Sequence, residues 1–126
     1  MDTFSRVETW IDENKELAVG FLQQLIRIPS INPWFSDYQE YTTEKEVQEF
    51  LAKSLKELGF DVTLWETDSG LLKEYKDYPG SYEGRPRHDR PILYACYQGT
   101  GNGRSLLLTG HADVVKVGEG WTRDPF

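Results

Sequence analysis

The chain has 126 residues, close to the usual size of one domain, and its 38% hydrophobic content predicts a globular rather than a disordered protein. The net charge of −7 argues against nucleic acid as the main partner, because the 14 Lys and Arg gather on no basic face. No apolar run approaches the roughly 20 residues of a membrane-spanning helix, and the N-terminus lacks the basic start and apolar segment of a signal peptide. With a single cysteine, Cys96, we expect a soluble cytoplasmic protein without a membrane partner.

The first predicted element is a helix over Ser5–Arg27, with a bend near Asn14 where a short run is wholly polar. Ser5 and Glu8 have the spacing of a capping box, in which each side chain satisfies a backbone N–H of the first turn. Pro29 ends the helix, because the residue before a proline is disfavoured in the α region, and residues 28–33 are predicted as extended chain and turn. Hydrophobic residues recur at helical intervals on both sides of the bend: Phe4, Val7, Ile11, Phe21, Leu22, Leu25 and Ile28.

A second helix is predicted to begin at a capping box over Thr43–Glu46. Gly59 is placed to close it in the left-handed conformation, which glycine adopts without a Cβ clash. Residues 60–65 then alternate between apolar and polar side chains, the period of a β-strand. The apolar face of the helix consists of Val47, Phe50, Leu51, Leu55 and Leu58.

Residues 68–90 break every regular pattern with glycines, prolines and charges of both signs, and we predict an inserted, solvated loop. An alternative is a small anion site formed by Arg85, Arg87, His88 and Arg90. His88 is also an alternative second metal ligand, although nothing near it in the sequence supports that role.

The last predicted elements are two strands joined as a hairpin, over residues 91–97 and from Ser105 onward. Cys96 is most simply a small core residue of the first strand, since no activating partner is visible. The glycine-rich connection does not have the spacing of a phosphate loop, because Arg104 stands where a dinucleotide fingerprint needs its third glycine. Leu106–Leu108 form a short apolar run, which favours a strand buried on both faces.

His111 and Asp113 follow this run at a spacing of two residues. Side chains at i and i+2 of an extended chain share a face, so the carboxylate can hold one ring nitrogen of the histidine and leave the other for a metal. A carboxylate in that position is the usual device that orients a zinc-bound imidazole. The alternatives are an ordinary surface pair, or an Asp113 that caps the next turn or pairs with Lys116.

Three segments together resemble the zinc aminoacylase and carboxypeptidase family, which includes acetylornithine deacetylase, succinyl-diaminopimelate desuccinylase and bacterial glutamate carboxypeptidase. They are Leu25–Ser30, with its R-I-P-S sequence, Leu106–Val115, with G-H-A-D-V-V, and Gly120–Phe126. The resemblance covers most of the chain outside residues 68–90.

By this resemblance His111 is a zinc ligand and Asp113 is the catalytic-site residue that orients it. The resemblance implies an α/β fold, in which a mixed β-sheet flanked by helices forms a zinc-peptidase-like catalytic domain that carries an inserted lid and dimerisation domain. It further implies two zinc ions per active site, for which cobalt can substitute, and a homodimeric enzyme. The reaction implied is cleavage of an amide bond in a small N-acyl amino acid or peptide by an activated water.

The remaining family ligands and the general base have no counterpart in residues 1–126. Because zinc needs three or four ligands, we expect the chain to be an incomplete N-terminal part of the catalytic domain, without the lid domain and inactive in isolation. The alternative is a stand-alone binding or interaction module that keeps the fold without the chemistry.

Overall fold

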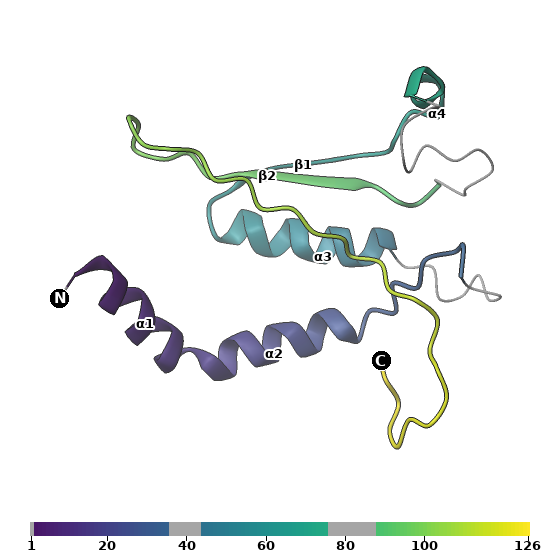
Figure 1. Cartoon of the computed structure of the whole chain (residues 1–126), viewed down its shortest axis with the longest axis horizontal. Coiled ribbons are helices and arrows are strands. Elements are labelled where there is room, and N and C mark those ends of the chain that lie inside the picture. The colour runs from purple at the N-terminus through teal and green to yellow at the C-terminus, as the bar shows by residue number, and fades with distance from the viewer. Residues whose placement is uncertain (1, 36–43, 76–87) are drawn as a thin grey trace.

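The computed structural model describes residues 2–35, 44–75 and 88–126, which form helices and a two-stranded antiparallel sheet (Figure 1). None of the described helices is long and apolar enough to cross a membrane. In chain order the elements are α1 (Thr3–Glu13), α2 (Lys15–Ile26), α3 (Glu44–Glu57), β1 (Asp61–Trp65), α4 (Ser69–Leu72), the 3-10 turn η2 (Lys73–Tyr75) and β2 (Ile92–Cys96).

Helices α1 and α2 confirm the predicted N-terminal helix and its bend. The break falls at Asn14, whose Nδ2 donates to the carbonyl of Trp10 at 2.7 Å. The predicted cap is wrong: the N-cap is Asp2, whose Oδ1 accepts from the N–H of Ser5 at 3.0 Å. An N-cap side chain accepts from the amide two or three residues later. Asp2 is therefore the cap, and Ser5, which the sequence predicted as the cap, instead supplies the bonded amide.

Helix α3 and the strands β1 and β2 lie where the sequence predicts them, although the pairing of β1 with β2 was not predicted. The helix packs against both strands (Figure 1). Gly59 has a φ of +86° and ends the helix as expected. Strands β1 and β2 pair in a register that sets Thr63 opposite Tyr94. Phe21 of α2 meets Phe50 of α3 with ring centroids 5.4 Å apart, which ties the N-terminal helices to this unit. Thr43 of the predicted capping box lies outside the described residues.

Two predictions for the second half of the chain are wrong. Leu106–Leu108 form no strand, and their exposed fractions are 82%, 83% and 82%. A strand needs ladder hydrogen bonds from a neighbour, and no described segment supplies them here, so the predicted hairpin is also absent.

Within the predicted loop, Asp68 caps the short helix α4 through a bond from the N–H of Gly70 to its Oδ1 at 2.7 Å. Residues 76–87 of that loop lie outside the described part of the chain.

The described core is small. Its buried apolar residues are Ile31, Val47 and Ala52, and Ser30 is buried as well. Ile31 forms an isolated parallel bridge with Val114. The described residues therefore combine helices with a small antiparallel sheet, which is compatible with the predicted α/β class. The predicted mixed sheet is not seen among them, because the parallel contact of Ile31 with Val114 lies outside the sheet.

Candidate active site

The candidate site is built on the bridge between residues 30–32 and residues 112–114. The N–H of Asn32 donates to the carbonyl of Val114 at 2.9 Å, and the N–H of Val114 donates to the carbonyl of Ser30 at 2.9 Å. The buried hydroxyl of Ser30 donates to the carbonyl of Ala112 at 2.6 Å. These three bonds fix the backbone of the H-x-D segment against the chain that follows α2.

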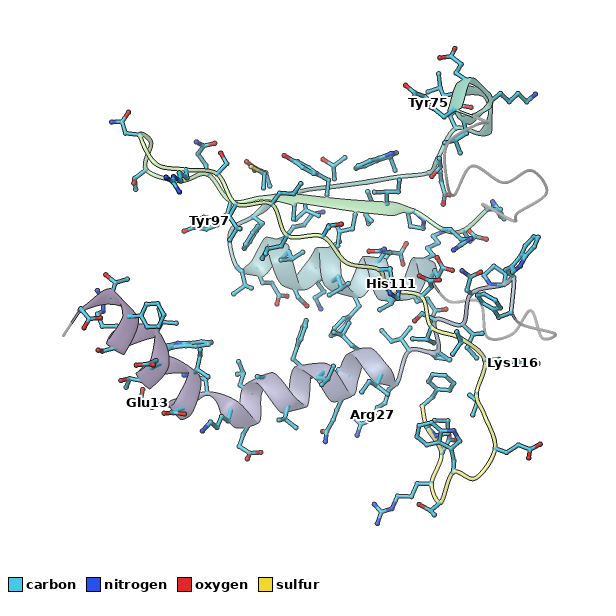
Figure 2. The ribbon with its side chains drawn as sticks, viewed as in Figure 1. Glu13, Arg27, Tyr75, Tyr97, His111 and Lys116 are labelled. Atoms are coloured by element: carbon cyan, nitrogen blue, oxygen red, sulfur yellow. The ribbon has the colours of Figure 1, made fainter. Side chains whose placement is uncertain are left out.

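His111 and Asp113 meet as their spacing predicts. Nδ1 of His111 lies 3.1 Å from Oδ1 of Asp113 and 2.9 Å from the backbone carbonyl oxygen of the same residue. A carbonyl oxygen can only accept, so Nδ1 carries a proton, and in the neutral imidazole Nε2 then presents its lone pair. The histidine side chain is 84% exposed, whereas that of Asp113 is 26% exposed. Figure 2 shows His111 beside the N-terminal end of α3.

A third residue, Asn32, completes this arrangement and has no counterpart in the sequence prediction. Its Nδ2 donates to Oδ2 of Asp113 at 2.6 Å, and its Oδ1 accepts from the N–H of Trp34 at 2.9 Å. Because the Trp34 amide can only donate, it fixes which end of the Asn32 side chain faces Asp113. An Asx turn at Asn32 is a signal that the sequence does offer, but its contact with Asp113 spans 81 residues.

A partly buried ion pair lies next to the site. Nε of Arg90 contacts both carboxylate oxygens of Glu44 at 2.8 Å, and Glu44 is only 9% exposed. Burial raises the pKa of Glu44 above its usual range; Arg90 opposes this shift, and the negative charge of Asp113 adds to it. Glu44, Arg90, His111 and Asp113 all line one hollow of about 430 Å³. The sequence prediction used Glu44 only as part of a helix cap.

Among the described residues, the other candidates do not join this site as ligands. His88 contacts its neighbour Asp89, with Nε2 2.9 Å from Oδ2, and its side chain is 92% exposed. Arg85 and Arg87 of the possible anion site lie outside the described residues, and Cys96 is half-buried on β2.

A zinc ion requires three or four protein ligands, more than the described donors around His111 supply. Nε2 of His111, with Nδ1 held by a carboxylate, fits a single ligand position. No group of three or more His, Cys, Asp and Glu side chains that could hold a metal occurs among residues 2–35, 44–75 and 88–126. The described residues therefore fit one ligand of a zinc site and do not fit a complete one.

The chain is similar to three curated proteins, two of which have the same name. It is 30% identical over 112 residues to succinyl-diaminopimelate desuccinylase of Wolinella succinogenes, and 31% identical over 112 residues to that of Methylobacterium radiotolerans. It is 27% identical over 120 residues to N-formyl-4-amino-5-aminomethyl-2-methylpyrimidine deformylase of Halalkalibacterium halodurans.

These alignments cover 89%, 88% and 92% of this chain but only 22% of each relative, so the chain spans about a fifth of their length. No protein-family model matches the chain, and no solved structure matches it significantly. The relatives confirm the resemblance that the three motifs indicated: along most of its length, this chain is similar to hydrolases of the zinc aminoacylase and carboxypeptidase family.

Proposed function

We propose that this chain is part of a metal-dependent hydrolase that cleaves the amide bond of an N-acyl amino acid or a small peptide. The observation that carries the proposal is the His111–Asp113 contact, which in the neutral imidazole favours the tautomer with its proton on Nδ1 and a lone pair on the exposed Nε2. The names of the relatives add the reaction class, because a desuccinylase and a deformylase each remove an acyl group.

In this proposal His111 is a metal ligand through Nε2 and Asp113 is the residue that orients it. Hydrogen bonding of Nδ1–H to a carboxylate makes the imidazole a stronger electron donor and holds its ring plane. Zinc, when bound, would polarise the amide carbonyl. Since the described residues fit one ligand position only, the general base and the other ligands are assigned to no residue of this chain.

The hollow beside His111 is large enough to hold a small substrate. Its volume of about 430 Å³ falls in the range of small-molecule pockets. Its polar lining includes Gln48, Thr67 and Thr109, which can donate hydrogen bonds as well as accept them. An acyl amino acid carries both carbonyl and carboxylate acceptors, so these side chains suit it.

The first test is a zinc titration of the ¹⁵N-labelled chain, followed through the ring nitrogens of its two histidines. We expect weak binding that perturbs Nε2 of His111 first and that is lost in His111→Ala. The matched control is His88→Ala, which removes the other imidazole and should leave the titration unchanged. Zinc that perturbs His88 or Cys96 before His111 would contradict the ligand assignment.

The second test asks about chemistry. Residues 1–126 replace the matching segment of the Wolinella succinogenes desuccinylase, and the chimera is assayed on N-succinyl, N-formyl and N-acetyl amino compounds. We expect hydrolysis that a chelator abolishes and that His111→Ala reduces to background. An active chimera that is indifferent to His111→Ala would refute the proposed function and favour a binding module.

A further inference from the structure

Asn32 is 81 residues away from Asp113 in the sequence, and it contacts the carboxylate oxygen of Asp113 that His111 does not. The two oxygens of Asp113 have separate partners: Oδ1 lies 3.1 Å from Nδ1 of His111, and Oδ2 accepts from Nδ2 of Asn32 at 2.6 Å. With one oxygen bound, the Asp113 side chain can still pivot about that contact by changing both χ1, about Cα–Cβ, and χ2, about Cβ–Cγ. With each oxygen bound to a separate partner, both torsions are restrained.

The Asn32 amide is itself held in place. Its Oδ1 accepts from the N–H of Trp34 at 2.9 Å, and its own backbone N–H donates to Val114 at 2.9 Å. Turning the amide over would set its oxygen against the Asp113 carboxylate and its NH₂ against the Trp34 N–H, replacing two attractive contacts by two repulsive ones. The direction in which Asn32 donates is therefore set by the backbone around it.

We propose that Asn32 is a positioning residue, which holds the Asp113 carboxylate in the orientation that in turn holds His111. A bond from a neutral amide to a carboxylate is charge-assisted and is shorter and stronger than a neutral one. The effect on metal binding rests on the proposed function, in which Nε2 of His111 is a metal ligand. The orientation itself is a property of the metal-free chain.

A purely structural role makes a different prediction. Asn32 also forms a turn through Trp34, and a residue kept for that turn would need only an oxygen at the Oδ1 position. Asn32→Asp separates the two roles, since it keeps the acceptor for Trp34 and replaces the NH₂ group with an oxygen of nearly the same size. At a pH high enough to keep both carboxyl groups ionised, the variant sets two carboxylates against each other without a proton between them, which disfavours the observed rotamer of Asp113.

The experiment measures the χ1 rotamer of Asp113 from three-bond couplings in the labelled, metal-free chain. We expect one dominant rotamer in the wild type. In Asn32→Asp the ratio of that rotamer to all others should fall about tenfold or more, the factor that a hydrogen bond to a charged group contributes. The matched control is Asn102→Asp, which makes the same substitution in the loop after β2, where the φ of +60° is one that aspartate tolerates.

An unchanged Asp113 rotamer in Asn32→Asp, with the amide signals of α3 and β1 intact, would overturn the proposal. If those amide signals are lost, Asn32→Ala replaces the variant, because it removes the donor without adding charge, and the same fall in the rotamer ratio is expected. Since no metal is present, a failure here leaves the zinc titration of His111 unaffected. A failure of that titration likewise leaves the rotamer result standing.

Discussion

Each carboxylate oxygen of Asp113 has its own partner, Nδ1 of His111 or Nδ2 of Asn32. A substitution at this position must therefore replace two acceptors. An asparagine at this position has one oxygen, which could accept either from Nδ2 of Asn32 or from Nδ1 of His111. Its NH₂ group would then face a donor at the other contact. No orientation of the amide preserves both hydrogen bonds.

We therefore predict that Asp113→Asn weakens zinc binding at His111 without removing the ligand. The backbone carbonyl of Asp113 still holds the proton on Nδ1, so the loss should be about 10-fold, at the lower end of the 10- to 100-fold range for residues that orient a ligand. The zinc titration of the labelled chain measures it. If the variant matches the wild type in affinity and remains folded, Asp113 does not orient His111.

The buried Glu44 makes stability depend on pH. Because its pKa is raised above the ordinary 4.5, the folded chain holds this proton more tightly than the unfolded chain. The free energy of unfolding is therefore greatest, for this group, below about 4.5 and falls as the pH rises through the folded-state pKa.

Glu44→Gln should remove this pH dependence, so its stability relative to the wild type should improve as the pH rises from about 4.5. Denaturant unfolding at a series of pH values measures the difference. The matched control is Glu49→Gln, an exposed position on the same helix, which should run parallel to the wild type. Parallel profiles for Glu44→Gln would contradict the raised pKa.

At the scale of elements, helix α3 ends in a Schellman motif centred on Gly59. The N–H of Phe60 donates to the carbonyl of Leu55 at 3.0 Å, and the N–H of Gly59 donates to the carbonyl of Lys56 at 2.9 Å. The φ of Gly59 is +86°, a conformation that other residues adopt at a cost. A Cβ at this position would meet only the Tyr97 ring at 3.9 Å, an ordinary contact.

We predict that Gly59→Ala lowers the free energy of unfolding by about 1–2 kcal/mol, entirely through backbone strain. Gly103→Ala is the control, since it lies in an open loop without a positive φ and a Cβ there has no neighbour within 4 Å. Chemical denaturation of both variants gives the comparison. A cost at Gly103 as large as that at Gly59 would show that the left-handed conformation is not the cause.

Elements that depend on local signals could be predicted from the sequence, and contacts that join distant segments could not. Helix α3 follows from its apolar period and its closing glycine, and the His111–Asp113 contact follows from a spacing of two. The contacts of Asn32 with Asp113 and of Glu44 with Arg90 span 81 and 46 residues, and no local pattern specifies them. The prediction of a strand at Leu106–Leu108 was wrong for a related reason. An apolar run indicates that a strand is possible, but it does not indicate which neighbouring segment would pair with it.

At the scale of the whole molecule, the described surface carries large apolar side chains that a stable monomer rarely exposes. They include Leu106 at 82%, Leu107 at 83% and Leu108 at 82% exposure, in an extended segment with no ladder partner among the described residues. Unpaired extended backbone and apolar side chains both promote association.

We predict that the chain self-associates with increasing concentration, and that the double variant Leu106→Ser, Leu108→Ser shifts this association to higher concentration. Light scattering over a dilution series measures it. Leu71→Ser, at an exposed position of α4, is the control and should have little effect. A single monomer peak at all concentrations, with cooperative unfolding, would contradict this prediction and favour a stand-alone module.

The bond from Ser30 to Ala112 joins residues 82 positions apart, so everything between them forms one closed loop. The entropy lost in closing a loop grows only with the logarithm of its length, and doubling the length costs about 0.6 kcal/mol. Residues 68–90, between β1 and β2, lie inside this loop. An insertion or deletion in that segment would therefore add little to the entropic cost of closing the bridge between residues 30–32 and 112–114, provided that Arg90 kept its contact with Glu44.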